Sequence, residues 1–300
     1  MIATSKDEAN AIEEELMLLS IQDKFSYSIQ ERVVKVTSMA GYVKLSLFLL
    51  DSMLGISSNS ISSTMSSKIY IPSYMAYTSV LNRLRKWKKI DTMRETLQKL
   101  SHACKITRKQ EKLDIVALNT YLAAICDTMK MRNDGEKDVE LMREAMDLLY
   151  PGVATEKYTL PDPDVMSFNT VLNAAAEMKN GTLVNEAIHL MKKQGIAPDI
   201  VTYNAMLKAA PTAGFKVSVV DEILETPDLV ADRYTVEMAI MPLVEEGRIP
   251  DLLNLLHGFS SADQPEHAVQ NAYSTFLLAL IKVRIFTIIT ITWIHPTLRS

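Results

Sequence analysis

One nine-residue pattern occurs twice in this chain, thirty-five residues apart, and constrains the fold more than any other feature. Residues 164–172 read D-V-M-S-F-N-T-V-L and residues 199–207 read D-I-V-T-Y-N-A-M-L, each directly after a proline. Both segments open an apolar run with helical spacing, and in the first of them we expect the helix to begin at Asn169. A period in this range is typical of repeat architectures, in which each unit buries its apolar face only by stacking on its neighbours. The pattern therefore predicts a stacked array.

Weaker copies of the pattern precede these two. Residues 114–125 read D-I-V-A-L-N-T-Y-L-A-A-I, and residues 75–84 read M-A-Y-T-S-V-L-N-R-L. Further first helices are expected at 27–39, from Asp232 and over 266–282. Second helices are expected after turns, over 40–55, 139–149, 183–193, 219–224 and 252–256, with breaks at Asn180-Gly181, near Gly214 and at 246–248 and a glycine cap at Gly195. The sequence thus predicts an all-α solenoid of antiparallel helix pairs, about six to seven repeats of roughly 35 residues.

The ends and insertions divide the chain further. Residues 1–25 form an acidic N-terminal segment without a visible secretory signal or transit peptide. The array is expected over 26–283, with insertions near 56–68, 131–138 and 151–162, and residues 151–161 are expected to form a long exit loop. The tail at 284–300 has an apolar, strand-like composition. A membrane span is disfavoured because Lys282 and Arg284 interrupt the apolar stretch, so we expect a last helix with an unpaired apolar face or an altered end.

The charge is unevenly distributed. The net charge of −4 argues against a globally basic nucleic-acid binder. Between residues 83 and 112, however, eleven Lys and Arg residues face only three acidic ones. This run is either a solvated helix face or a surface that attracts phosphate, since basic side chains release counterions from a polyanion. The second interpretation assigns phosphate contacts to Arg83, Arg85, Lys86, Lys88 and Lys89.

No catalytic or metal-binding motif is present in the sequence. The five histidines are scattered. Cys104 and Cys126 lie far apart in the sequence without a C-x-x-C motif, which predicts free thiols in a reducing compartment. Motifs for zinc, nucleotide and nucleophilic chemistry are missing. We therefore expect no enzyme activity, no cofactor, no metal, no small-molecule substrate and no membrane partner.

The repeated pattern resembles the pentatricopeptide repeat family. The resemblance rests on P-D-I-V-T-Y-N-A-M-L at 198–207, P-D-V-M-S-F-N-T-V-L at 163–172, D-I-V-A-L-N-T-Y-L at 114–122 and N-E-A-I-H-L-M-K-K-Q-G-I-A-P-D at 185–199. It covers roughly residues 27–282. A tetratricopeptide array would instead show a Gly-Tyr and Ala/Pro signature, without Pro-Asp before an aromatic-Asn pair.

The resemblance implies a right-handed α-solenoid that binds single-stranded RNA, about one base per repeat, through a few side chains. It further implies a role in RNA processing, stability or translation in a mitochondrion or chloroplast, with a cytoplasmic location as the alternative. Protein processing factors are possible additional partners.

The base-reading residues follow from the same resemblance. An asparagine amide offers both a donor and an acceptor to a base edge. Each asparagine is matched with the aspartate that opens the next repeat, giving Asn119 with Asp164, Asn169 with Asp199, and Asn204 with Asp232. These pairs resemble those that prefer uracil, then cytosine, whereas Thr78 with Asp114 resembles the guanine pair. Glu237 is matched by Val269 and reads nothing. The implied target is a U-rich stretch with G on its 5′ side.

The resemblance also implies that side chains three residues before the reading position wedge against base faces. They are the aliphatic residues Val116, Met166 and Val201, together with Tyr234, which would stack.

Two alternatives stay open at this point. Each asparagine can instead bond its own backbone, and each aspartate can be a plain N-cap. The array as a whole can be a tetratricopeptide-like scaffold that holds a protein in the same groove. The basic run and the Asn/Asp pairs favour RNA, while the overall acidity and the seventeen methionines favour the scaffold.

Overall fold

Every regular element in the described part of the chain is a helix. The computed structural model describes residues 26–55, 69–107, 112–132, 135–262 and 264–289. The helices within these ranges are α2 (Tyr27–Ala40), α3 (Val43–Met53), α4 (Tyr74–Lys86), α5 (Ile90–Ile106), α6 (Ile115–Arg132), α7 (Gly135–Asp147), α8 (Val153–Tyr158), α9 (Val165–Glu177), α10 (Gly181–Lys193), α11 (Ile200–Ala209), α12 (Ala213–Glu225), α13 (Arg233–Glu245), α14 (Ile249–Ser261) and α15 (Glu266–Ile289). The expected all-α class is confirmed, whereas the handedness and the number of repeats stay predictions.

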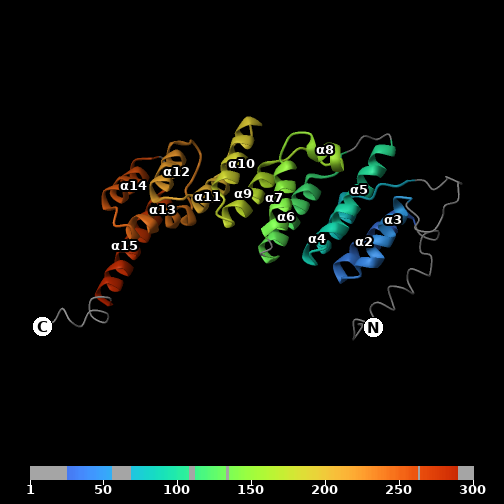
Figure 1. Ribbon diagram of the computed structural model, residues 1–300, viewed down its shortest axis with the longest axis horizontal. Coiled ribbons are helices and arrows are strands. Elements are labelled where there is room, and N and C mark those ends of the chain that lie inside the picture. Colours follow the sequence, from blue (N-terminus) through green and yellow to red (C-terminus); the bar gives the residue numbers. More distant parts are fainter. Residues whose placement is uncertain (1–25, 56–68, 108–111, 133–134, 263, 290–300) are drawn as a thin grey trace. The chain divides into compact units, whose positions relative to one another are not determined.

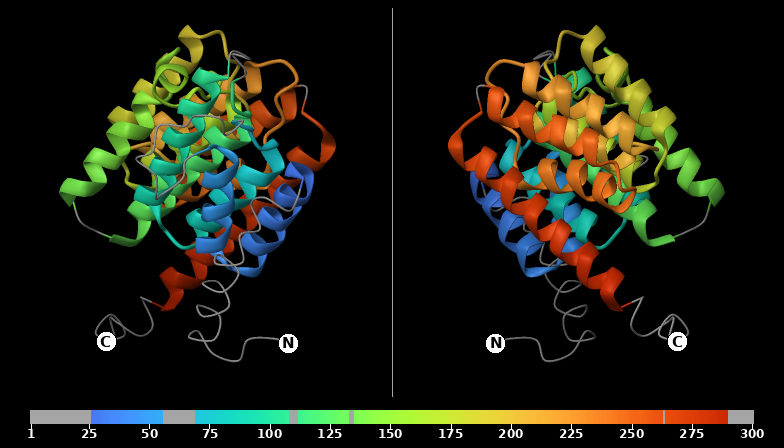
Figure 2. Two further views of the ribbon diagram at one scale, coloured as in Figure 1. Left: turned by 90° about the vertical axis from the view of Figure 1, so that its right-hand side faces the viewer. Right: turned by 90° about the vertical axis from the view of Figure 1, so that its left-hand side faces the viewer.

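The chain divides into two compact units, residues 1–171 and 172–300, with the boundary inside α9. In the first unit α4 packs between α2 and α6, so the first helices of successive pairs lie side by side (Figures 1 and 2). The second helix α3 packs on α2 and α4, and α5 packs on α4, α6 and α8. This unit is therefore a two-layer stack of helix pairs.

The second unit repeats the arrangement. Helix α13 packs between α11 and α15 in one layer, and α12 packs on α14 in the other (Figure 1). Its core is built from apolar residues of both layers, with Leu207, Ile240 and Phe259 fully buried. Stacking of pairs thus supplies the core, as the sequence pattern predicted.

A common register explains which residues are buried. The eighth residue of α4, α6, α11 and α13 is apolar and 0 % exposed in each helix (Leu81, Leu122, Leu207 and Ile240). Along α15 the apolar side chains of Tyr273, Leu277, Leu278 and Ile281 are instead 44–57 % exposed. Among the described residues, no second helix follows α15 to cover them.

Three local expectations were wrong. The loop expected over 151–161 contains the short helix α8. The turn expected near Gly214 lies earlier, because the Thr212 hydroxyl caps the backbone N–H of Phe215 and α12 begins at Ala213. Asn169 lies inside α9 rather than at its start, because the helix already begins at Val165.

Helix α8 is held by a polar cluster around Glu144 of α7, whose side chain is only 12 % exposed. The carboxylate accepts hydrogen bonds from Arg94 of α5 at 2.9 Å and from the Tyr121 hydroxyl of α6 at 2.7 Å. Tyr158 of α8 donates to it at 3.3 Å. Burial by itself raises the pKa of Glu144, but the hydrogen bonds from Arg94 and Tyr121 outweigh burial and lower it. The charged carboxylate thus ties four helices together.

Positive backbone angles recur in the turns after first helices. Gly41 has φ 101° and Gly247 has φ 67°, a region in which glycine carries no steric penalty. Lys88 and Lys179 occupy this left-handed region too, with φ 56° and 53°. A non-glycine residue costs roughly 1–2 kcal/mol there.

Of the two alternatives expected for the C-terminal segment, the structure agrees with a last helix as far as residue 289. Residues 283–289 continue α15 as a helix, despite their strand-like composition. Residues 290–300, the acidic segment 1–25 and the serine-rich insertion at 56–68 lie outside the described residues. Within the described part, no helix combines the length and the apolar character that crossing a bilayer requires.

Candidate nucleic-acid interface

The aspartates of the repeated pattern cap the first helices. Asp199 and Asp232 each accept from the backbone N–H three residues later, at 2.9 Å and 2.7 Å, and form capping boxes with Thr202 and Thr235. Asp164 accepts from the Ser167 N–H at 2.8 Å in the same way. The alternative that the aspartates are N-caps is therefore correct for Asp164, Asp199 and Asp232.

In the first unit, the cap also holds the asparagine of the preceding repeat. The Asn119 side chain on α6 donates to Asp164 Oδ1 at 3.3 Å. The Ser167 hydroxyl lies 2.6 Å from Asn119 Oδ1 and donates to it. One amide is thus oriented by two residues of the next helix start, forty-five and forty-eight positions along the chain.

The second unit contains the same arrangement. Asn204 on α11 donates to Asp232 Oδ2 at 3.1 Å, and Thr235 donates to Asn204 Oδ1 at 2.7 Å. Asp232 therefore uses one carboxylate oxygen for the cap and the other for the amide. The expected pairings of Asn119 with Asp164 and of Asn204 with Asp232 are confirmed as contacts; their role in reading bases stays a prediction.

The sequence analysis missed the hydroxyl residues Ser167 and Thr235. The signal was present, since D-V-M-S at 164–167 and D-R-Y-T at 232–235 both place a hydroxyl three residues after the aspartate. Each hydroxyl donates to the amide oxygen, so the amide nitrogen is the end that faces the aspartate.

The amides of Asn119 and Asn204 keep part of their hydrogen-bonding capacity. An asparagine has two N–H hydrogens and two oxygen lone pairs, and one of each is used here. Asn204 is 9 % exposed and Asn169, at the equivalent place on α9, is 8 % exposed. Only an edge of these amides is accessible. A ligand must therefore approach closely along the first helices.

Another predicted pair, Thr78 with Asp114, is arranged differently. The buried Thr78 hydroxyl donates to the carbonyl oxygen of Tyr74 in its own helix. Asp114 accepts from the Val116 N–H at 2.8 Å, and its backbone N–H donates to the Tyr77 hydroxyl at 2.9 Å. Among the described residues, no hydrogen bond joins Thr78 to Asp114.

The four predicted wedge residues are exposed. Val116, Met166, Val201 and Tyr234 retain 44 %, 63 %, 43 % and 45 % of their accessible surface. Each is the second residue of its helix and lies three positions before the reading position, so the two share a helix face. Met75 occupies the same place on α4 and is 48 % exposed, although the sequence analysis did not assign it. Large apolar side chains in these places suit contact with a flat ring.

The basic residues at the end of α4 have different surroundings. The Arg83 guanidinium donates to the carbonyl oxygens of Ser38 and Met39 at the end of α2. Arg85 forms an ion pair with Asp127 at 2.8 Å. Lys86 and Lys89 are exposed, and Lys88 is half-buried. The arginines thus serve packing between helices, while the lysines are the cations best placed for phosphate.

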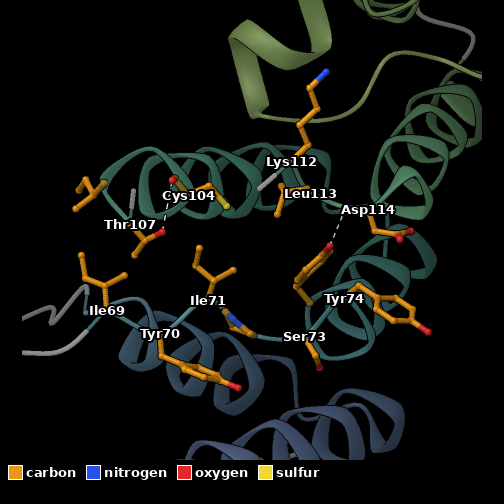
Figure 3. Close-up of a pocket in the computed structure, with 13 residues that line it drawn as sticks. Ile69, Tyr70, Ile71, Ser73, Tyr74, Cys104, Thr107, Lys112, Leu113 and Asp114 are labelled. Atoms are coloured by element: carbon orange, nitrogen blue, oxygen red, sulfur yellow. Dashed lines mark hydrogen bonds between the residues drawn. The ribbon is translucent and has the colours of Figure 1, made fainter. Parts of the chain in front are cut away.

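A cavity of about 770 Å³ lies beside the start of α4 (Figure 3). Its lining includes Tyr70, Tyr77, Cys104, Thr107 and Leu113. Burial raises the pKa of Tyr77 to about 12, so its hydroxyl stays protonated at neutral pH. In Figure 3 the Lys112 ammonium points away from the cavity. The described residues contain no group of three or more His, Cys, Asp or Glu that could hold a metal ion.

Comparison with known proteins supports the resemblance. Residues 162–211 match the family model of the pentatricopeptide repeat domain. The expected pentatricopeptide repeats are thereby confirmed over this segment, which contains the two copies of the pattern in 164–172 and 199–207.

Solved structures of pentatricopeptide repeat proteins are also similar to this chain. One is PPR10 in complex with an 18-nt psaJ RNA element, at 19 % identity and a TM-score of 0.46, covering 92 % of this chain and 38 % of that one. Another is PPR10 from maize, at 17 % identity and a TM-score of 0.33, covering 96 % of this chain and 45 % of that one. The chain thus spans less than half the length of either structure. No curated protein matched the sequence.

Proposed function

We propose that the first helices of this protein bind single-stranded RNA and prefer a short U-rich stretch. The observation that carries the proposal is the hydroxyl–amide–carboxylate arrangement, found at Asn119 in one unit and at Asn204 in the other. It holds an amide in one orientation before any ligand arrives. A preorganised group loses little freedom on binding.

The chemistry of the amide suits a pyrimidine. The remaining N–H and lone pair can meet the adjacent carbonyl oxygen and N3–H of uracil, or the corresponding groups of cytosine. The exposed wedge residues three positions earlier supply an apolar surface for the ring faces. Reading and stacking groups therefore lie on the same helix face.

We assign attraction of the RNA phosphate backbone to the lysines. The formal charge of the whole chain is −4, so binding depends on local cations rather than on net charge. Lys86 and Lys89 are exposed at the end of α4. We assign phosphate contacts to these lysines rather than to Arg83 and Arg85, whose guanidinium groups are engaged within the protein.

The cellular role proposed from the family resemblance is processing, stability or translation of an organellar transcript. Imaging of the tagged full-length protein tests the location. Recovery of a mitochondrial or chloroplast transcript after cross-linking would support this role, whereas a purely cytoplasmic signal would contradict it.

Binding of labelled U-rich and A-rich single strands across a salt series tests the proposed activity. The account predicts tighter binding of the U-rich strand, and affinity that falls steeply with salt because phosphate contacts release counterions. Failure of both strands to bind at low salt would leave the protein-scaffold alternative as the better explanation.

A further inference from the structure

The turn between α4 and α5 carries a large aromatic side chain among lysines. Residues 86–89 read K-W-K-K. Trp87 is 49 % exposed, although tryptophan is usually well buried. The reading and wedge positions lie at the other end of the first helices, and nine residues separate Trp87 from Thr78, about 13 Å along a helix axis. This turn is therefore a separate surface.

The Trp87 ring is supported on one side by the neighbouring helix pair. Its Cζ2 atom lies 3.8 Å from the position that a Cβ would occupy at Gly41, in the turn between α2 and α3. Gly41 has φ 101°, so a side chain is disfavoured there by backbone conformation as well. The ring thus lies beside a turn that has no side chain at Gly41, and about half of the Trp87 surface stays exposed for another contact.

The acidic residues near this turn have partners elsewhere. Asp91 pairs with Arg94 at 2.8 Å, Glu95 with Lys99 at 3.2 Å, and Asp127 with Arg85 at 2.8 Å. Each of these pairs uses a cation other than the exposed Lys86 and Lys89. Two exposed positive charges therefore flank Trp87 in the sequence.

Lys88 occupies a conformation that glycine takes in comparable turns. Its φ of 56° matches the left-handed region of Gly41 and Gly247. A lysine gains nothing in backbone energy over glycine at such a position. The turn therefore carries a third lysine at a position whose backbone conformation favours glycine.

From these observations we propose that the α4–α5 turn is a second RNA contact, in which one unpaired base stacks on Trp87 while the lysines bind the flanking phosphates. This inference rests on the proposed RNA binding and adds a site outside the reading positions. Stacking on an aromatic ring accepts any base, so the site adds affinity without changing sequence preference.

Intrinsic fluorescence tests the contact directly, because Trp87 and Trp293 are the two tryptophans of the chain. In a Trp293→Phe background, titration with the U-rich strand should quench the Trp87 emission at the concentrations at which the labelled strand binds. Unchanged emission at saturating RNA would overturn the stacking proposal and leave the proposed function intact.

Substitution supplies an independent measurement. Trp87→Ala should weaken binding about tenfold, the change expected for loss of one stacked base, and Trp87→Phe should stay within about threefold of the wild type. Trp87→Leu is the matched control, because it keeps apolar volume without an aromatic face and should bind like the alanine variant. The ratio of U-rich to A-rich affinity should not move in any of them.

Equal affinity of the Ala, Leu and wild-type proteins would overturn the second contact. If neither the wild type nor any of the variants binds RNA at low salt, the proposed function and this inference fail together. Circular dichroism of each variant separates these outcomes from misfolding, and the quenching experiment uses an unaltered Trp87.

Discussion

The Thr235 hydroxyl donates to the amide oxygen of Asn204 at 2.7 Å, across thirty-one residues of sequence. Thr235 belongs to the capping box of α13, and Asn204 lies on the preceding first helix α11. The residue that starts one repeat therefore orients the candidate reading residue of the repeat before it. Ser167 does the same for Asn119 in the other unit. One hydroxyl thus takes part both in capping α13 and in orienting the candidate reading amide.

Thr235→Val should damage both functions of that hydroxyl. Thr235 is 0 % exposed, so valine fits the volume but leaves the amide oxygen of Asn204 and the Asp232 N–H without their partner. We expect a loss of about 2 kcal/mol in unfolding free energy, measured by urea denaturation, together with weaker U preference. Thr235→Ser keeps the hydroxyl and should retain both properties. An equal preference for U in the valine and serine variants would show that the hydroxyl caps the helix but does not contribute to base recognition.

Removing the charge of Lys86 and removing that of Arg83, both at the end of α4, should have different effects on RNA binding and on stability. Lys86→Gln should flatten the dependence of log affinity on log salt by about 0.7, the value for one phosphate contact on a single strand. Arg83→Gln should instead lower stability by about 1 kcal/mol, because it removes hydrogen bonds to the end of α2. A salt slope that falls more for Arg83→Gln than for Lys86→Gln would contradict this division.

Stability should depend on pH through Glu144. Its pKa is lowered from 4.5 in the folded protein, so the stabilisation is fully present above the unfolded-state pKa and is lost as pH falls through the folded value. Glu144→Gln should cost about 2–3 kcal/mol at pH 7, and the difference from wild type should shrink below about pH 4.5. Thermal unfolding at pH 7, 5 and 3.5 checks this. A difference that stays constant over the series would show that charge is not the cause.

The repeat register predicts that the same substitution has effects of very different size at two leucines. Leu207 on α11 is 0 % exposed and Leu277 on α15 is 57 % exposed. Leu207→Ala should destabilise the protein by about 3 kcal/mol, whereas Leu277→Ala should change stability by less than about 0.5 kcal/mol. Chemical denaturation of the two variants compares the same substitution in both surroundings. A large loss at Leu277 would reveal that its face of α15 is covered in solution.

The repeat pattern made the helix pairs predictable from sequence, because apolar spacing and the Pro-Asp starts are local signals. Residues 183–193 were expected as a helix and form most of α10. The helix α8 was not foreseen, since a six-residue helix held by Glu144 depends on contacts with α5, α6 and α7 rather than on local propensity. The helical course of 283–289 likewise overrides a strand-like composition.

The candidate site was predictable in part for the same reason. The resemblance to the pentatricopeptide repeat family paired Asn204 with Asp232, and the structure brings them into contact. The hydroxyl of Thr235 was missed because a cap is a local assignment, whereas its bond to Asn204 crosses to another helix. Thr78 illustrates the converse, since its hydroxyl is satisfied by Tyr74 in its own helix and the matching pattern does not produce the matching contact.

The most direct test of the account is the base preference of the double variant Asn119→Ala, Asn204→Ala. Asn82, which is exposed on α4, provides the control substitution Asn82→Ala. Equilibrium binding of U-rich and A-rich strands should show that the wild type and the control prefer the U-rich strand, and that the double variant binds both with similar, reduced affinity. An unchanged preference in a correctly folded double variant would show that these amides hold the repeats together and do not read the RNA.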